Sequence, residues 1–262
     1  MSGSGKSLAN QVAVISGGLG DIGRAIAMEL ARRGADIAIS DVRDPSDASD
    51  ALGAIAALGV RCRYDQVDVA NDEAVDTWVR AVEQSLGVGS LVIANAAIVT
   101  IADFRTVLPE QWRHELDVNL TGSFNLARTA AARLLHHQRP GRIVFIGSWA
   151  AHAPHPNIVA YCVAKAGLRM LCRCMALDLA PHGILVNEVA PGYVDAGLSA
   201  KLWAKNPGSR EKAAGRVPTG TLIDAAEVAT QVAHLCEPDN RHMTGSVIVM
   251  DGGLSLVTPA NR

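Results

Sequence analysis

Three residues of the chain, Ser148, Tyr161 and Lys165, have types and spacing that could move a proton to or from a carbonyl or alcohol oxygen. Tyr161 and Lys165 open an expected helix, and Ser148 ends the expected strand before it. Residues at i and i+4 share one helical face, so both side chains can enter one cleft. A neighbouring ammonium stabilises a phenolate, so we expect Lys165 to lower the pKa of Tyr161. Tyr161 is the candidate general acid or base, and Ser148 the candidate partner of the same oxygen.

A glycine-rich turn, SGGLGDIG from Ser16 to Gly23, could hold a dinucleotide. Glycines let the backbone approach a pyrophosphate closely, and the helix that follows offers its N-terminal amides. An expected strand before the turn and an expected helix after it supply the context that this motif requires. Asp41 lies at the end of the next expected strand, directly after its last residue. Its carboxylate could bind ribose hydroxyls and would repel a 2′-phosphate, so NAD is favoured over NADP, although Arg43 could soften the repulsion.

Alternating strand and helix patterns define the elements that must position these residues. The expected strands are 12–16, 36–40, 62–69, 91–97, 142–148, 184–189 and 246–250, and the clearest helices are 21–33 and 71–86, the second capped by Asn71. This alternation predicts an α/β fold: a doubly wound, mostly parallel sheet with helices on both faces. The mixed segment 195–224 fits neither pattern. We interpret it as a long excursion, with a substrate lid at about 195–220.

Composition excludes several classes of protein. Lys plus Arg number 24 and Asp plus Glu 26, a net charge of −2, so neither nucleic acid nor an anionic membrane is an expected partner. With 49% hydrophobic residues, the 262-residue chain is expected to form one domain over 9–262 after a flexible tail at 1–8. No signal or anchor pattern is found, so a cytoplasmic protein is expected. The five cysteines lack metal-type spacing, so we expect no metal site and buried or half-buried thiols.

Together these motifs resemble those of the classical short-chain dehydrogenase/reductase family, from about Leu8 to Leu256. The matching positions are the glycine turn, Asp68-Val69, Ala94-Asn95-Ala96-Ala97, Asn119, Ser148, Tyr161 with Lys165, Asn187 through Pro191-Gly192, Thr244-Gly245 and Asp251-Gly252-Gly253. The resemblance implies a Rossmann-type domain with a seven-stranded parallel sheet, commonly assembled as a homotetramer. It also implies an oxidoreductase that transfers hydride between a nicotinamide cofactor and a small-molecule secondary alcohol or ketone.

The resemblance also implies roles for individual positions. Tyr161 would be the acid/base, Ser148 would orient the substrate oxygen, Lys165 would also hold the nicotinamide ribose, and Asn119 would hold a water that links Lys165 to bulk solvent. The cofactor would contact Ser16, Gly17, Asp21, Ile22, Gly23, Asp41, Val42, Asp68, Val69, Asn95, Ala96, Ala97, Tyr161, Lys165, Pro191, Gly192 and Val194.

Some positions depart from the family pattern. Asp21 stands where the classical turn has glycine, so we expect its carboxylate to point away from a pyrophosphate and to cap the helix it begins. Asp195 and Ala196 occupy the stretch where the family places a threonine that bonds the nicotinamide amide. The side chain that usually anchors that amide is therefore missing from this stretch. Ala94 and Ala97 replace the usual Asn and Gly of their motif, which should alter packing more than chemistry.

The substrate pocket is expected to include Ser148, Ala150, His155, Tyr161 and Tyr193. Its mostly apolar character suits a medium-sized secondary alcohol or ketone, but it does not identify a particular substrate. Two alternative enzymes remain open: a 3-oxoacyl-thioester (acyl-carrier-protein) reductase and a sugar dehydrogenase of the glucose 1-dehydrogenase type. A third alternative, from a different class, is a cofactor-sensing binding protein without turnover.

Overall fold

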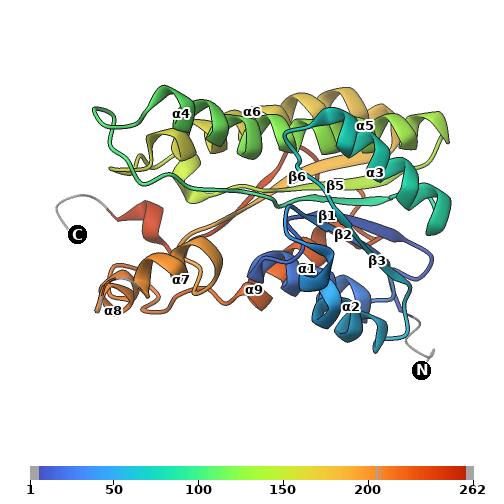
Figure 1. Cartoon of the computed structure of the whole chain (residues 1–262), viewed down its shortest axis with the longest axis horizontal. Helices are drawn as coiled ribbons and strands as arrows, with labels where there is room; N and C mark the ends of the chain where they lie inside the picture. The colour runs from blue at the N-terminus through green and yellow to red at the C-terminus, as the bar shows by residue number, and fades with distance from the viewer. Residues whose placement is uncertain (1–5, 205, 207, 258–262) are drawn as a thin grey trace.

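The computed structural model describes residues 6–204, 206 and 208–257, and Figure 1 shows a twisted sheet between two layers of helices. The sheet is seven-stranded, with the order β3-β2-β1-β4-β5-β6-β7 and parallel pairing throughout. The strands are β1 (Val12–Ser16), β2 (Asp36–Asp41), β3 (Cys62–Gln66), β4 (Leu91–Ala94), β5 (Gly141–Ile146), β6 (Ile184–Pro191) and β7 (Val247–Met250). The predicted doubly wound α/β fold is confirmed.

Helices cover both faces of the sheet. One layer contains α1 (Asp21–Arg32), α2 (Ser49–Ala56) and α9 (Ala225–Cys236), and the other contains α3 (Asp72–Ser85), α4 (Pro109–Leu116), α5 (Gly122–His136) and α6 (Val159–Leu179). Each layer buries its own hydrophobic cluster against the sheet. Central strands are therefore buried along their whole length, as the continuous burial of β1, β4 and β6 shows.

Most expected boundaries agree with the structure to within a few residues. Strand β1 matches the prediction, and the Asn71 side chain caps α3 by accepting from the amide of Ala74 at 3.0 Å. Strands β3, β4 and β5 end earlier than predicted, at Gln66, Ala94 and Ile146. The residues just past these ends, which include Val67, Ala96 and Ser148, line a cavity at this edge of the sheet rather than pair with a neighbouring strand.

The expected flexible tail at 1–8 is wrong for its last residues. Leu8 is fully buried in the core beside α1, and its amide donates to the carbonyl of Arg33 at 2.9 Å. The Lys6 ammonium donates to the carbonyl of Leu58 at 2.8 Å. Apolar burial therefore places Leu8 within the folded domain, whereas residues 1–5 lie outside the described part of the chain.

The excursion after β6 contains two short helices that the sequence pattern did not predict, α7 (Gly197–Trp203) and α8 (Ser209–Ala214). They project together at the end of the molecule away from the N-terminus (Figure 1). A parallel bridge between Val194 and Ile223 closes the base of the excursion, and Asp195 forms an ion pair with Arg210 of α8. We use the term lid segment for residues 195–220, of which 205 and 207 are not described.

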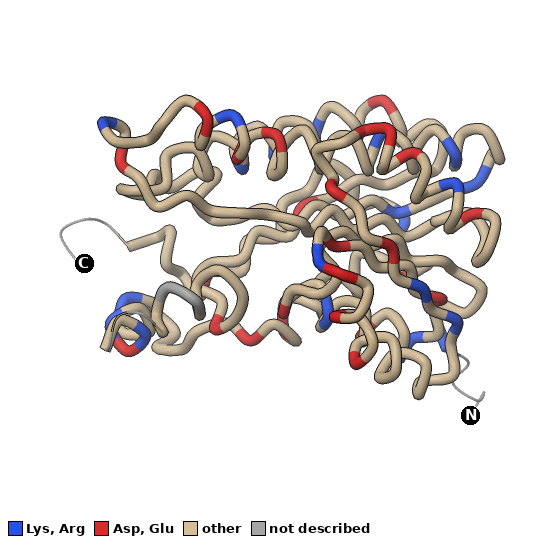
Figure 2. The backbone as a smooth tube through the Cα atoms, in the orientation of Figure 1, with Lys and Arg blue, Asp and Glu red and all other residues tan. Residues whose placement is uncertain are grey.

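Charges of both signs are interspersed along the backbone (Figure 2). Among the described residues, no helix is long and apolar enough to cross a bilayer, and no group of three or more His, Cys, Asp or Glu side chains is arranged to hold a metal ion. The five cysteines are free thiols, and Cys174 is exposed rather than buried or half-buried as expected.

Candidate functional site

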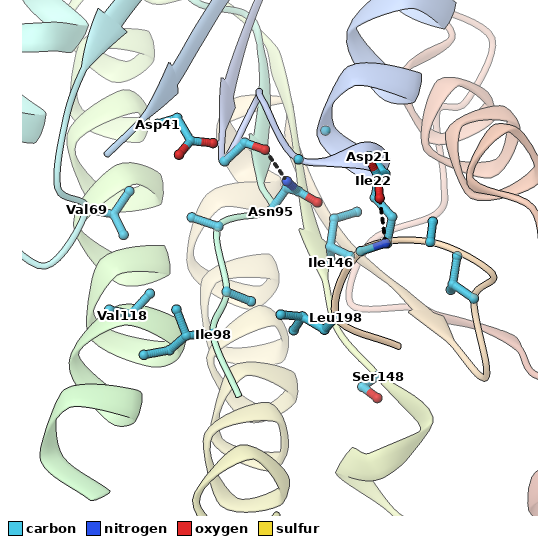
Figure 3. A pocket seen from close by; sticks show the side chains of 18 of the residues that line it. Asp21, Ile22, Asp41, Val69, Asn95, Ile98, Val118, Ile146, Ser148 and Leu198 are labelled. Carbon is cyan, nitrogen blue, oxygen red and sulfur yellow. Dashed lines mark hydrogen bonds between the residues drawn. The ribbon is translucent and has the colours of Figure 1, made fainter. Parts of the chain in front are cut away.

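A cavity of about 570 Å³ opens at the carboxyl ends of the parallel strands. Asp41 lies at one end and Ser148 at the other (Figure 3). This edge of an open α/β sheet is where ligands of such folds bind. Of the predicted site residues, the cavity lining includes Gly17, Asp21, Ile22, Gly23, Asp41, Val42, Asp68, Val69, Asn95, Ala96, Ala97, Ser148, Tyr161, Lys165, Pro191, Gly192 and Val194.

The turn between β1 and α1 requires its glycines. Gly17 has a positive φ of 63°, and a Cβ there would lie 2.8 Å from the Cα of Ala96. A Cβ on Gly23 would collide with the carbonyl oxygen of Gly17. The Asn95 amide donates to the carbonyls of Ser16 and Gly17, both at 3.0 Å, and Figure 3 draws the bond to Gly17. The segment after β4 therefore braces the turn and fixes the start of α1.

Ser16 was expected to contact a cofactor. Its side chain is buried and helps to join the glycine turn to the segment after β4. Its hydroxyl accepts from the amides of Asn95 and Ala96 at 3.1 and 3.2 Å. It is not part of the cavity lining. The side chain therefore supports the turn from behind, and a direct contact with a ligand stays a prediction.

The Asp21 carboxylate does not cap α1 as expected. The N-cap position is occupied by Gly20, which has no side chain to cap the helix. Instead, Oδ2 of Asp21 accepts from the amide of Gly197 at 2.7 Å, an interaction drawn in Figure 3. This bond joins the first turn of α1 to the start of α7, because the lid segment passes close to the glycine turn. Asp21 thus ties the lid segment to the wall of the cavity.

Asp41 sits at the far end of the cavity with both carboxylate oxygens engaged. Oδ2 accepts from the amide of Leu19 at 3.2 Å, and the guanidinium of Arg43 lies 3.4 Å away. Arg43 also lines the cavity. A ligand at this end therefore meets an acidic group with a cation beside it, as expected for Asp41 and Arg43.

Tyr161 and Lys165 both project from α6 into the cavity, close to Ser148 of the β5 end. The Lys165 ammonium donates to the carbonyl of Ile146 at 2.8 Å and lies 5.5 Å from the centre of the Tyr161 ring. The Ser148 hydroxyl accepts from the amide of Ala150 at 3.1 Å and lowers the pKa of the Tyr161 phenol by hydrogen bonding. The structure thus brings the three predicted side chains together.

The expected effect of Lys165 on Tyr161 is not seen. Burial raises the pKa of Tyr161 to about 12 and lowers that of Lys165 to about 8. Desolvation disfavours the charged form of each group, so it acts in opposite directions on an acid and a base. Lys165 loses its charge before the phenol titrates, and its ammonium is directed at a backbone carbonyl. In this arrangement Ser148, rather than Lys165, is the group that favours the phenolate.

Asn119 is fully buried in a π-helical turn, Asp117–Thr121, and does not line the cavity. Its side chain accepts from the amide of Ile98 and donates to the carbonyl of the same residue, both at 2.8 Å. Ile98 itself lines the cavity. Asn119 therefore holds the cavity wall in place through its side chain, and the water that it was expected to hold stays a prediction.

Three expected substrate residues, Ala150, His155 and Tyr193, are not in the cavity lining. Ala150 is buried, and the other two pack edge-on against Trp149, with ring centres 4.1 and 5.4 Å away. This aromatic cluster adjoins Ser148 in sequence. The cavity lining instead includes Ile98, His114, Val118 and Ser199, which were not predicted, and Leu198, which was expected as part of the substrate lid. Helix α4, the π-helical turn and α7 supply four of them, elements whose place over the site only the fold determines.

Sequence reasoning also missed Glu115, a fully buried carboxylate on α4. Its Oε2 accepts from the amide of Thr100 at 3.0 Å. Burial raises the pKa of Glu115, and its negative charge acts to raise the pKa of both Tyr161 and Lys165. A signal was present in the sequence, because an acidic residue four positions before Asn119 falls on the same helical face.

The chain matches the family model described as enoyl-(acyl carrier protein) reductase over residues 18–255. It is 31% identical to the uncharacterized oxidoreductase YohF of Escherichia coli K12, covering 95% of this chain and 97% of that protein. It is 30% identical to 3-oxoacyl-[acyl-carrier-protein] reductase FabG of Vibrio cholerae, covering 96% and 100%. A short-chain type dehydrogenase/reductase from Mycobacterium marinum superposes with a TM-score of 0.89 at 28% identity, covering 95% and 97%.

These matches cover nearly all of the chain, and they agree with the sheet order and the cavity. The protein belongs to the classical short-chain dehydrogenase/reductase family, a family of oxidoreductases that generally use nicotinamide cofactors.

Proposed function

We propose that the protein is an NAD-dependent oxidoreductase acting on a secondary alcohol or ketone, with Tyr161 as its acid/base. One observation carries the proposal: a single cavity joins the glycine turn and Asp41 to the cluster of Ser148, Tyr161 and Lys165. A dinucleotide spans such a crevice from its adenosine to its nicotinamide end. The distribution of groups matches that direction, with an acidic group at one end and proton-transfer groups at the other.

The residues present fit a nicotinamide dinucleotide. The turn that precedes α1 presents backbone amides at the helix N-terminus, where a pyrophosphate is favoured. Asp41 would bind the adenosine ribose, Val42, Asp68 and Val69 would surround the adenine, and Pro191, Gly192 and Val194 would flank the nicotinamide. When bound, the nicotinamide supplies the hydride chemistry.

Side chains of the protein itself would carry out the proton transfer of the reaction. Ser148 would hold the substrate oxygen next to the Tyr161 hydroxyl, which gives a proton to a ketone or takes one from an alcohol. Lys165 is a cation below about pH 8 and would hold the nicotinamide ribose, whereas Ser148 is the group that favours the Tyr161 phenolate. Asn119 would fix the opposite wall through Ile98. Because Tyr161 itself is partly buried, the substrate oxygen meets it away from bulk water.

The test replaces Tyr161 by Phe, which removes one hydroxyl and keeps the ring. We expect turnover on a panel of alcohols and ketones to fall at least about a thousandfold while NADH still binds, because acid/base catalysis and cofactor binding use different groups. Tyr193→Phe is the matched control, since Tyr193 lies outside the cavity lining. Turnover retained by Tyr161→Phe would refute the assigned role. NADH binding with no turnover by the wild-type protein would favour a cofactor sensor.

A second candidate, a 3-oxoacyl-thioester reductase, is favoured by the description of the matching family model and by the FabG relative. Such an enzyme would need to accept an acyl thioester and, in the usual case, NADPH. Reduction of acetoacetyl thioesters with a strong NADPH preference would select it over the NAD-dependent alcohol dehydrogenase. Oxidation of glucose would instead select the sugar dehydrogenase.

The oligomeric state is a separate question. Gel filtration would test the homotetramer that the family resemblance implies.

A further inference from the structure

A buried ion pair lies directly beneath the Ser148 end of the cavity. Arg169 of α6 donates through Nε and Nη2 to the two carboxylate oxygens of Glu188 on β6, at 3.0 and 2.8 Å. The Glu188 side chain is fully buried, and that of Arg169 is 13% exposed. The cavity does not include either residue, so the pair is no part of the binding surface described above.

The same guanidinium reaches two further partners around Ser148. Its Nη2 donates to the carbonyl of Ser148 at 3.2 Å, and its Nη1 lies 2.9 Å from Nδ1 of His152. Arg169 therefore joins both ends of the turn Ser148–His152 to the interior of the fold. Ser148 begins this turn, directly before the short helix at Trp149–Ala151, and His152 ends it, directly after that helix.

The residues at the end of β5 pack closely around the ion pair of Arg169 and Glu188. One helical turn before Arg169, Lys165 holds the carbonyl of Ile146, so successive turns of α6 hold the two carbonyls that flank Gly147. A Cβ at Gly147 would collide with the carboxylate of Glu188. The charge of Glu188 also acts to raise the pKa of Lys165. The end of β5 thus packs closely against the Glu188 carboxylate, although an apolar side chain could also fill a buried position of this kind.

Stability alone gives a poor reason to keep such a pair. Removing two charges from water is costly, and buried ion pairs are often replaced by apolar residues of similar volume without loss of stability. An arginine also offers several donors in a fixed planar fork, which suits it to hold several groups in one geometry. Here that fork is shared among Glu188, Ser148 and His152, which is a geometric task.

We propose that Arg169 and Glu188 are positioning residues that hold Ser148, and the turn that follows it, in the place from which Ser148 meets Tyr161 and the substrate oxygen. Glu188 orients the guanidinium, and the guanidinium fixes the Ser148 carbonyl and His152. The inference rests on the proposed function for its kinetic consequence. Its structural consequence, an ordered turn at Ser148–His152, can be measured without turnover.

The experiment replaces the pair as a unit, with Arg169→Met and Glu188→Leu in one chain. An apolar pair leaves no unpaired buried charge, so the midpoint of thermal unfolding should stay within a few degrees of wild type. We expect kcat to fall at least about tenfold with less than threefold change in KM or in the Kd for NADH. Amide exchange in peptides covering residues 147–158 should rise severalfold, while peptides from β1 and α1 stay unchanged.

The matched control is the ion pair between Arg133 of α5 and Glu83 of α3, which is bidentate at 2.6 and 2.8 Å and lies outside the cavity lining. Arg133→Met with Glu83→Leu should leave kcat and the exchange of 147–158 unchanged. If the Arg169/Glu188 double variant keeps both wild-type kcat and wild-type exchange, the pair is structural only and the proposal is overturned.

A single variant covers the case in which the double variant does not fold. Arg169→Lys keeps the positive charge next to Glu188 and loses the fork, so it should show the same fall in kcat and the same rise in exchange. Wild-type values for Arg169→Lys would overturn the proposal. If the wild-type protein turns over no substrate, the proposed function fails, and amide exchange alone then decides whether the pair orders the turn.

Discussion

Replacing Lys165 by Met should change the stability of the protein in a way that depends on pH. The folded chain holds Lys165 with a pKa of about 8, against an ordinary value of 10.5. Between these two values the unfolded chain binds more protons than the folded chain, so wild-type stability gains from each rise in pH. The burial penalty is fully present below about pH 8 and disappears above about pH 10.5. Met at this position carries no such penalty.

The size of the effect follows from the two pKa values. Linkage gives a penalty of about 3 kcal/mol near pH 7 and less than about 1 kcal/mol near pH 10. The difference in unfolding free energy between wild type and Lys165→Met should therefore move by about 2 to 3 kcal/mol in favour of wild type over that interval. The bond from Lys165 to the carbonyl of Ile146 is lost in the variant at every pH, so it cancels from the change.

The assay is urea unfolding of both proteins at several pH values from about 7 to 10, since titrating groups remote from Lys165 act equally on both and drop out of the difference. Lys6→Met serves as a control, because Lys6 also donates to a backbone carbonyl at 2.8 Å but from an exposed side chain. A difference that stays flat with pH, or that moves in favour of the variant, would refute the assignment of a desolvated Lys165.

Three further outcomes are expected. Asp41→Asn should bring NADPH affinity at least about tenfold closer to NADH affinity in fluorescence titrations, because a like-charge contact with the 2′-phosphate is removed; an unchanged ratio would contradict the ribose role. Asp21→Ala, which loses the bond to Gly197, should raise tryptic cleavage within the lid segment severalfold, and equal cleavage would mean that this bond does not restrain the segment. Glu115→Gln should shift the pH profile of alcohol oxidation to lower pH, because the charge of Glu115 raises the pKa of Tyr161 and Lys165; superimposed profiles would show that Glu115 exerts no charge effect there.

The sheet and the glycine turn could be predicted because their signals are local. Apolar runs of strand length mark each buried strand, and the turn after β1 demands glycine at Gly17 and Gly23 for steric reasons. The same local logic failed for Leu8, which a polar sequence context concealed. A single apolar side chain such as Leu8 can be fully buried where the chain passes along the core, and one residue has no hydrophobic periodicity from which its burial could be predicted.

The parts of the site that escaped prediction depend on contacts between distant segments. Asp21 was expected to cap its own helix, yet its carboxylate binds the amide of Gly197, which the fold brings to it from far along the chain. The pKa of Tyr161 was expected to follow its neighbour Lys165, yet burial by the surrounding fold dominates. Spacing identifies which side chains can meet, whereas desolvation and pairing depend on what else the tertiary structure places around them.

Helix α6 explains why one face of one helix can both position and tune the site. Tyr161, Lys165 and Arg169 succeed one another at intervals of four residues, so their side chains form a single stripe toward the end of β5. The first reaches the cavity, the second holds Ile146 and lines the cavity, and the third binds Ser148 from below. Glu188 provides the compensating charge for the last two. A rotation of α6 would displace all three contacts together, so the geometry of the proposed proton transfer is coupled to the packing of the whole helix on the sheet.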